Sequence, residues 1–189
     1  MLAIASLNLA ARGTRDQAAR RQLVDVADRL CAHADAHRAL AMPTPQARCD
    51  VGEYIARVCS ALAAAIRSEP GLRLKLEVGD VALPSDRCWR LALIVSELVH
   101  NATRHGGRAG EILVELSSAG SQLVCAVSNA GGCECAPEYG RGRRVVLALT
   151  EELGGRADWV FTPVGARALV IVPLDGRPSG ERQQPPIAI

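Results

Sequence analysis

Aromatic residues, long apolar runs and an excess of one charge are all scarce in this chain. Only 3% of its 189 residues are Phe, Trp or Tyr, too few for the stacked aromatic side chains that bind single-stranded nucleic acid. The 22 basic and 20 acidic residues leave a net charge of +2, which predicts no strong attraction to nucleic acid or to an anionic membrane. No run of about 18 apolar residues occurs, so the sequence predicts no transmembrane helix.

Cysteine pairs of the metal-binding kind are also missing. The seven cysteines include no CxxC pair, which argues against a zinc ribbon and a disulfide framework. Cys133 and Cys135 are separated by one residue and have no histidine nearby, a spacing that does not suit a metal site. We therefore interpret the cysteines as reduced thiols that pack as small hydrophobic side chains. Since Met1 to Ala11 lacks the pattern of a signal peptide, we expect a cytoplasmic protein.

The periodicity of apolar residues predicts helices first and then a mixed half. Residues 2–11 are predicted to be the end of one helix. A second helix is predicted over 14–42, with Thr14 and Gln17 as its capping box, and a third is predicted to start near Asp50. After residue 71 the expected order is a strand at 72–78, a helix after Ser85, strands at 111–117 and 122–128, a helix at 143–153, and strands at 156–162 and 167–173. This order predicts an α+β fold, with an N-terminal helical hairpin and a two-layer sandwich.

Polar residues gather near the end of the helix that follows Ser85. Glu97, Asn101 and Arg104 are spaced so that they share one face of that helix, and His105 follows directly. An Asn carbonyl can bind Mg²⁺ together with phosphate oxygens, a Glu can accept a proton, and an Arg can pair with phosphate. A solvated helix face would show the same pattern, so this segment alone decides nothing.

Two glycine-rich segments favour a functional interpretation. The strand at 122–128 leads into Asn129-Ala130-Gly131, and Gly140 and Gly142 open the next helix. Glycines at the start of a helix leave backbone N–H groups open to a phosphate, which the helix dipole also attracts. The order of the three segments is more specific than any one of them.

That order resembles the Bergerat-fold (GHKL) ATP-binding domain of sensor histidine kinases. Residues 97–106 (ELVHNATRHG) look like the family's N box, 129–131 like its first glycine box and 140–145 like its second. The resemblance covers about residues 72–174. The upstream segments 2–41 and 50–66 are similar to the dimerisation hairpin of the HWE-like histidine kinase subfamily.

The resemblance implies a two-component histidine kinase core that uses ATP and Mg²⁺. Glu97 would polarise the attacking group, Asn101 would hold Mg²⁺ and Asn129 would contact adenine. The remaining residues that it implies for nucleotide binding are Arg104, His105, Gly131, Gly140 and Gly142. It also implies a homodimer that pairs its hairpins in a four-helix bundle, and a response regulator receiver domain as partner. We expect three parts: the hairpin over 1–70, the ATPase domain over 71–175 and a loose tail over 176–189.

Departures from the family pattern leave the activity open. The phosphoacceptor histidine should lie just before Leu2; either it lies upstream of Met1 or the protein does not autophosphorylate there. Asn129 replaces the family's aspartate, which removes charge assistance and predicts weaker ATP binding. Arg143 stands where the second glycine box usually has leucine. The alternatives are a non-catalytic kinase-like adaptor or phosphotransferase that binds a response regulator, and a serine kinase of the anti-sigma type, which normally lacks the hairpin.

The histidines offer few other acceptors. His37 is interpreted as a packed residue of the hairpin interface, and His100 as a surface residue. His33 is the other exposed candidate for phosphotransfer in the hairpin.

Overall fold

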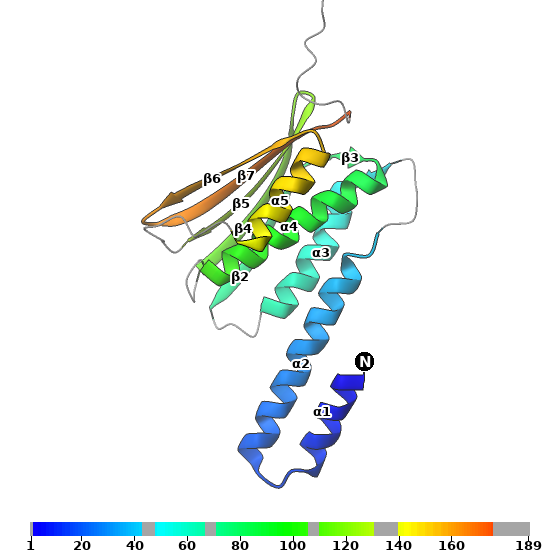
Figure 1. Ribbon diagram of the computed structural model, residues 1–189, viewed down its shortest axis with the longest axis vertical. Helices are drawn as coiled ribbons and strands as arrows, with labels where there is room; N and C mark the ends of the chain where they lie inside the picture. Colours follow the sequence, from blue (N-terminus) through cyan, green and yellow to red (C-terminus); the bar gives the residue numbers. More distant parts are fainter. Residues whose placement is uncertain (1, 43–47, 67–70, 106–109, 131–139, 176–189) are drawn as a thin grey trace, which may run out of the picture.

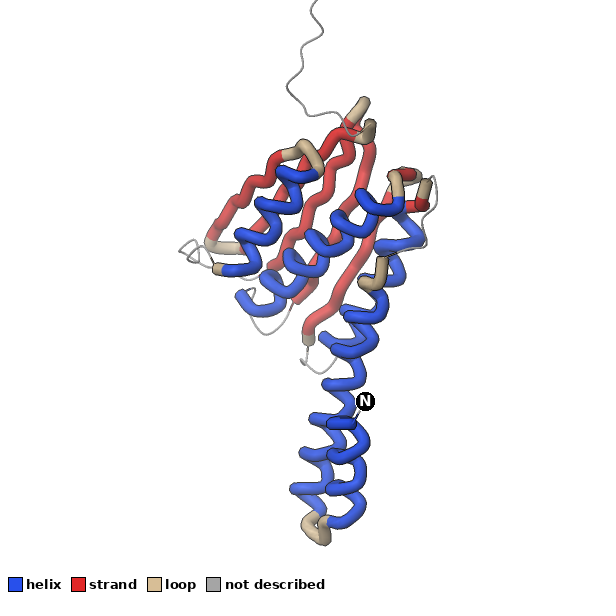
Figure 2. Tube along the Cα trace, turned by 45° about the vertical axis from the view of Figure 1, so that its right-hand side comes forward, coloured by secondary structure: helices blue, strands red, loops and turns tan. Residues whose placement is uncertain are grey.

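The fold is a two-layer sandwich from which a helical hairpin projects (Figure 1). The computed structural model describes residues 2–42, 48–66, 71–105, 110–130 and 140–175. In Figure 2, helices cover one face of the sheet and the other face is open. The expected α+β class and helical hairpin are therefore confirmed. Within the described ranges, no helix combines the length and the apolar character needed to cross a membrane.

The hairpin consists of α1 (Leu2–Gly13) and α2 (Gln17–Ala39). The expected capping box at Thr14 was wrong by two residues. The Thr14 N–H donates to the Ala10 carbonyl and so completes the last turn of α1. The side chain of Asp16 instead accepts a hydrogen bond of 2.8 Å from the Ala18 N–H and caps α2.

Helix α3 (Val51–Ile66) belongs to the core of the sandwich. It begins as expected at Asp50, whose Oδ1 accepts a hydrogen bond of 3.0 Å from the Glu53 N–H. Its buried residues are Val51, Tyr54, Ile55, Val58, Cys59, Leu62 and Ile66. They share one cluster with buried residues of α4 (Ser85–His105) and of the sheet. We expected this helix to belong to the hairpin over 1–70, but it packs in one core with α4 and the sheet, and a boundary at residue 70 would cut through that core.

Two hydrogen bonds attach the end of α2 to this core. The Tyr54 hydroxyl donates to the Ala41 carbonyl at 2.9 Å, and the Trp89 indole N–H donates to the Leu40 carbonyl at 2.9 Å. These carbonyls lie where a helix end leaves acceptors without intrahelical partners. The hairpin is thereby fixed to α3 and α4 at one end.

The sheet is mixed and has the order β2-β4-β5-β7-β6. Its strands are β2 (Leu72–Val78), β4 (Gly110–Ala119), β5 (Gln122–Ala130), β6 (Arg156–Thr162) and β7 (Gly165–Pro173). β2 and β4 are parallel because α4 crosses between them, whereas the other neighbours are antiparallel. A two-residue pairing of β1 (Cys49–Asp50) with β3 (Ala82–Leu83) was not expected.

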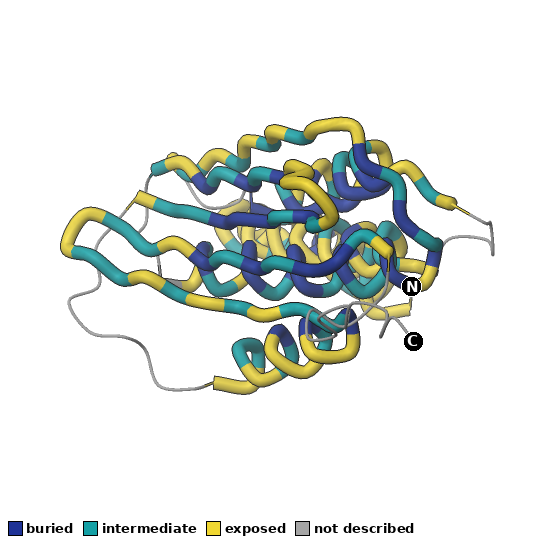
Figure 3. The backbone as a smooth tube through the Cα atoms, turned by 90° about the horizontal axis from the view of Figure 1, so that it is seen from above, coloured by how far each residue is buried: buried dark blue, intermediate teal, exposed yellow. Residues whose placement is uncertain are grey.

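Helix α5 (Arg141–Glu152) completes the helical layer beside α4. Figure 3 shows buried positions alternating with half-buried and exposed ones along the sandwich. The buried Arg87 joins the layers, since its guanidinium donates to the Leu153 carbonyl at 3.1 Å and to the Pro173 carbonyl at 2.6 Å. This places the start of α4 beside the ends of α5 and β7.

Burial of the thiols makes stability depend on alkaline pH. Burial raises the pKa of Cys59 and of Cys125 from 9.0 to about 12. Below pH 9 both thiols are neutral in the folded and the unfolded chain. Between pH 9 and 12 they ionise only in the unfolded chain, so the free energy of unfolding should fall by about 1.4 kcal/mol per pH unit for each thiol. Urea denaturation at a series of pH values measures this slope. Cys125→Ala should make it shallower, and an unchanged slope would contradict the assignment.

Candidate functional site

Helix α4 presents the expected polar residues beside a buried face. Leu98, Val99 and Ala102 are buried against the core. Glu97 and Asn101 lie on another face and are half-buried, so their polar groups reach the surface of the helical layer. Arg104 is exposed one turn further on. His105 ends the helix, but its side chain lies outside the described residues, as does Gly131.

The start of α5 packs directly on Glu97 and Asn101. A Cβ at position 142 would lie 2.7 Å from Glu97 Oε2 and 3.2 Å from Asn101 Oδ1. Such distances leave almost no room for a side chain, so a glycine at 142 lets the first turn of α5 approach the carboxylate and the amide. The structure therefore brings together the segment at 97–101 and the glycine turn at 140–142, which lie about 40 residues apart in the sequence.

Gly140 provides no side chain of its own to cap the N-terminus of α5. It is the N-cap residue, with an extended backbone and no side-chain hydrogen bond to the helix. The first N–H groups of a helix have no intrahelical acceptors, and the helix dipole places partial positive charge there. This terminus can therefore accept an anionic group close to Glu97 and Asn101.

Asn129 faces the helical layer from the end of β5. It pairs in register with the buried Ile112 of β4 and with Ala166 of β7. Its Nδ2 is buried and has no hydrogen-bond partner among the described residues. Because a buried amide donor without an acceptor is costly, the group indicates a position that a ligand could complete.

Arg143 accounts for one departure from the family pattern. Its guanidinium carbon lies 4.3 Å from the centre of the Trp159 ring of β6. A cation stacked on an indole face is a favourable contact, and it directs this arginine towards the sheet. Its neighbours Arg141 and Arg144 are exposed.

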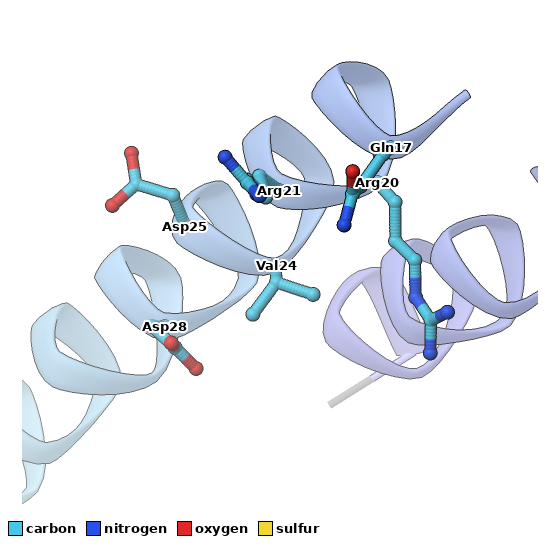
Figure 4. A pocket seen from close by; sticks show the side chains of 6 residues that line it. All are labelled: Gln17, Arg20, Arg21, Val24, Asp25 and Asp28. Atoms are coloured by element: carbon cyan, nitrogen blue, oxygen red, sulfur yellow. The ribbon is translucent and has the colours of Figure 1, made fainter.

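Two surface hollows lie apart from Glu97, Asn101 and Gly142. One, of about 410 Å³, includes Asn129, but its other lining residues, such as Leu113, Ser128 and Arg167, have the register of the open sheet face. The other, of about 420 Å³, lies on the first half of α2 (Figure 4). Its lining residues are Gln17, Arg20, Arg21, Val24, Asp25 and Asp28. Neither hollow includes Glu97, Asn101 or Gly142.

The structure also pairs two histidines whose contact the sequence did not reveal. The rings of His33 of α2 and His100 of α4 are stacked, with centroids 6.4 Å apart and planes within 10°. Their separation in the sequence gives no signal of this contact, because it depends on how α3 packs against both α2 and α4.

Comparison with known proteins identifies the fold. No family model matches the chain. It is 27% identical over 133 residues to blue-light-activated histidine kinase 2 of Erythrobacter litoralis. The aligned segment covers 66% of this chain and 38% of that protein. The chain thus spans about two fifths of the length of this curated relative.

Solved structures match over more of the chain. The histidine kinase domain of the blue-light-activated histidine kinase EL346 from Erythrobacter litoralis superposes with a TM-score of 0.65 and 21% identity, over 92% of this chain and 94% of that one. The chain has the fold of a histidine kinase catalytic core. Full-length ShkA, solved in complex with AMPPNP, matches with a TM-score of 0.57 and 16% identity, over 90% of this chain and 42% of that one.

A glycine of this kinase fold also fixes the position of Asn129. A Cβ at Gly165 would lie 2.3 Å from the Asn129 carbonyl oxygen, a contact with rigid backbone. Gly165→Ala should therefore destabilise the protein by about 1–3 kcal/mol. Gly79→Ala is the matched control, since its nearest neighbour would be 3.8 Å away. Urea denaturation of both variants checks this, and equal stabilities would contradict the expected contact.

Proposed function

We propose that this chain is the catalytic core of a protein-histidine kinase of two-component signalling and binds Mg-ATP where α4 meets α5. The observation that carries the proposal is the contact of Gly142 with Glu97 and Asn101. It supports a site in which a carboxylate, an amide oxygen and an uncapped helix N-terminus converge. Similarity to histidine kinases along most of the chain supports the same function.

The donor set suits magnesium that arrives with phosphate. Mg²⁺ prefers oxygen ligands and commonly takes one or two from the protein and the rest from phosphates and water. Asn101 Oδ1 would be the protein ligand. No cluster of three His, Cys, Asp or Glu residues that could hold a metal occurs among the described residues, which agrees with a metal held mainly by the nucleotide. Bound Mg²⁺ would neutralise charge on the phosphates.

The triphosphate would occupy the N-terminus of α5. The backbone N–H groups after Gly140 would bind phosphate oxygens, and Gly142 would admit them next to Asn101. The exposed guanidinium of Arg104 would contribute charge at the same edge. His105 and Gly131 complete the proposed binding residues on the basis of the family resemblance.

Asn129 would bind adenine through both atoms of its amide. The Oδ1 would accept from the exocyclic amine, and the buried Nδ2 would donate to a ring nitrogen. Such a pairing would supply the acceptor that Nδ2 does not find among the described residues. An amide provides this complementarity without the charge of the aspartate found in the family, so adenine binding would be weaker than in family members.

The reaction would transfer the γ-phosphoryl group to a histidine and then to an aspartate of a response regulator receiver domain. Glu97 would accept a proton or orient the attacking imidazole. The HWE-like subfamily fits the similarity to the Erythrobacter litoralis kinases. We further propose a cytoplasmic homodimer, supported by the apolar residues Leu9, Val26 and Leu30, which the hairpin leaves exposed.

A kinase-like adaptor is the second candidate function. The observation that favours it is Asn129, which stands where the family resemblance expects an aspartate and which lacks the charge of that residue. A protein of this kind would hold a response regulator through the same fold without turning over ATP.

Asn101→Ala tests the proposed site. The variant should bind a fluorescent ATP analogue at least about tenfold more weakly in the presence of Mg²⁺, equivalent to about 1.4 kcal/mol. The reason is that it removes the oxygen ligand that the protein would provide to Mg²⁺. Fluorescence titration with and without Mg²⁺ measures the effect. Asn8→Ala, an exposed helical asparagine of the hairpin, is the control and should bind like the wild type. Absence of saturable binding to the wild type at millimolar nucleotide would refute the kinase function and favour the adaptor.

Gly142→Ala separates stability from function. Alanine is the better helix former by about 0.5–1 kcal/mol, and the nearest atom that it would meet is the end of the flexible Glu97 side chain. The variant should therefore be as stable as the wild type, yet lose ATP turnover by about tenfold or more as Glu97 is displaced. Thermal unfolding and ATP hydrolysis measure the two effects. Gly13→Ala, which would meet nothing within 4 Å, should keep both; full activity of Gly142→Ala would argue against the assigned role of this contact.

A further inference from the structure

Two cysteines that are far apart in the sequence meet where β1 approaches the start of α4. Cys49 of β1 is paired in register with Leu83 of β3, and α4 begins two residues after Leu83, at Ser85. Residues directly opposite each other in an antiparallel pair point to the same side, so Cys49 points towards the core with the buried Leu83. Cys88 lies there in the first turn of α4, and its thiol forms a hydrogen bond with the Cys49 thiol.

The two thiols differ in exposure. Cys49 is half-buried and Cys88 is fully buried, and both are free. Burial, and after it the hydrogen bond with Cys49, raises the pKa of the Cys88 thiol, so Cys88 stays protonated at neutral pH. A dissolved oxidant can therefore reach the sulfur of Cys49, while Cys88 stands behind it as a second thiol. In such pairs oxidation of the first sulfur leads to a disulfide, which a reductant can reverse.

We propose that Cys49 and Cys88 are a redox-sensitive pair that hydrogen peroxide converts into a reversible disulfide. The inference is independent of the proposed kinase function, since it involves no nucleotide. In the reduced chain both side chains pack with the apolar core, as expected of small hydrophobic residues. Two sulfur atoms in hydrogen-bond contact need only a small shift of their side chains to bond, because the Cβ atoms of a disulfide are about 3.5–4.5 Å apart.

The reaction balances with hydrogen peroxide as the oxidant. The Cys49 thiolate attacks one peroxide oxygen, the O–O bond breaks, and the sulfur becomes a sulfenic acid while hydroxide leaves. The sulfur of Cys88 then attacks the Cys49 sulfur, and the S–O bond breaks. The Cys88 proton passes to the departing hydroxyl group, which leaves as water. In total the two thiols lose two electrons, and the peroxide is reduced to two molecules of water.

The disulfide would strengthen the junction between the hairpin and the sandwich. Trp89 directly follows Cys88 and donates to the Leu40 carbonyl at 2.9 Å. Both thiols also lie close enough to Tyr54 to raise the pKa of its hydroxyl, which burial raises most, and this hydroxyl donates to the Ala41 carbonyl at 2.9 Å. A covalent bond from β1 to α4 would thus join the two elements beside the hydrogen bonds that attach the end of α2.

Peptide mapping of the full chain tests the pair. Trypsin cleaves after arginine, so Cys49 falls in peptide 49–57 and Cys88 in peptide 88–90, and neither peptide contains another cysteine. The protein is treated with hydrogen peroxide, its remaining thiols are alkylated in urea, and it is digested without a reductant. Most of both peptides should be recovered linked to each other, and dithiothreitol before alkylation should return them separately. Cys59 should remain a free thiol because the core buries it.

Three variants show which sulfurs react. Cys49→Ser and Cys88→Ala should each abolish the linked peptide. Cys31→Ser, at a half-buried cysteine of α2, is the matched control and should keep it. In Cys88→Ala the oxidised Cys49 has lost its second thiol, so it should accumulate as sulfinic and sulfonic acid. If Cys88→Ala does not fold, Cys49→Ser decides alone, since its position is only half-buried.

Three results with the wild type would overturn the proposal. They are a Cys49 that remains a free thiol after peroxide treatment, a Cys49 that is oxidised to sulfonic acid although Cys88 is present, and a Cys49 that is linked mainly to a different cysteine. None of them bears on the ATP site, whose test is the titration of Asn101→Ala. Conversely, a wild type that binds no nucleotide but forms the linked peptide would refute the kinase function and leave the thiol pair standing.

Discussion

The contact between Gly142 and the side chains of Glu97 and Asn101 is the constraint on which the proposed site depends. Helices α4 and α5 lie side by side on the sheet (Figure 1), and Arg90 joins them near one end through its ion pair with Glu152. At the other end the two helices approach closely because residue 142 has no Cβ. One short interface thereby places a carboxylate, an amide oxygen and the uncapped start of a helix together. A bulkier residue at 142 would separate them without unfolding the protein.

A second constraint fixes the hairpin relative to that site. Tyr54 is buried and Trp89 is half-buried, and both use the polar ends of their rings to bind the last carbonyls of α2. Because α3 and α4 share one core with the sheet, the direction of α2 follows from the packing of the sandwich. The stacked pair of His33 and His100 results from this arrangement.

Several features of this site could be predicted from the sequence, and the reasons for the failures are physical. Glu97 and Asn101 are four residues apart, so helix geometry alone places them on one face. The glycine turn before α5 could be recognised, because glycines at the start of a helix leave its backbone N–H groups open to a phosphate. The predicted cap of α2 was wrong because Thr14 belongs to the last turn of α1, where its N–H donates to the Ala10 carbonyl. Local patterns do not show where one helix ends and the next begins. Helix α3 was assigned to the hairpin because an amphipathic helix does not reveal which partner its apolar face will meet.

The sequence by itself determined the periodicities, the α+β class and the order of the polar and glycine-rich segments, since these depend on neighbours within a few residues along the chain. Tertiary structure alone decided that Gly142 contacts Glu97, that Asn129 Nδ2 is buried without an acceptor among the described residues, and that His33 stacks on His100. Each of these depends on the distance and angle between elements that are remote in the sequence. Those quantities are set by how the apolar faces of α2, α3, α4 and α5 pack together on the sheet, and no local pattern of residues specifies them.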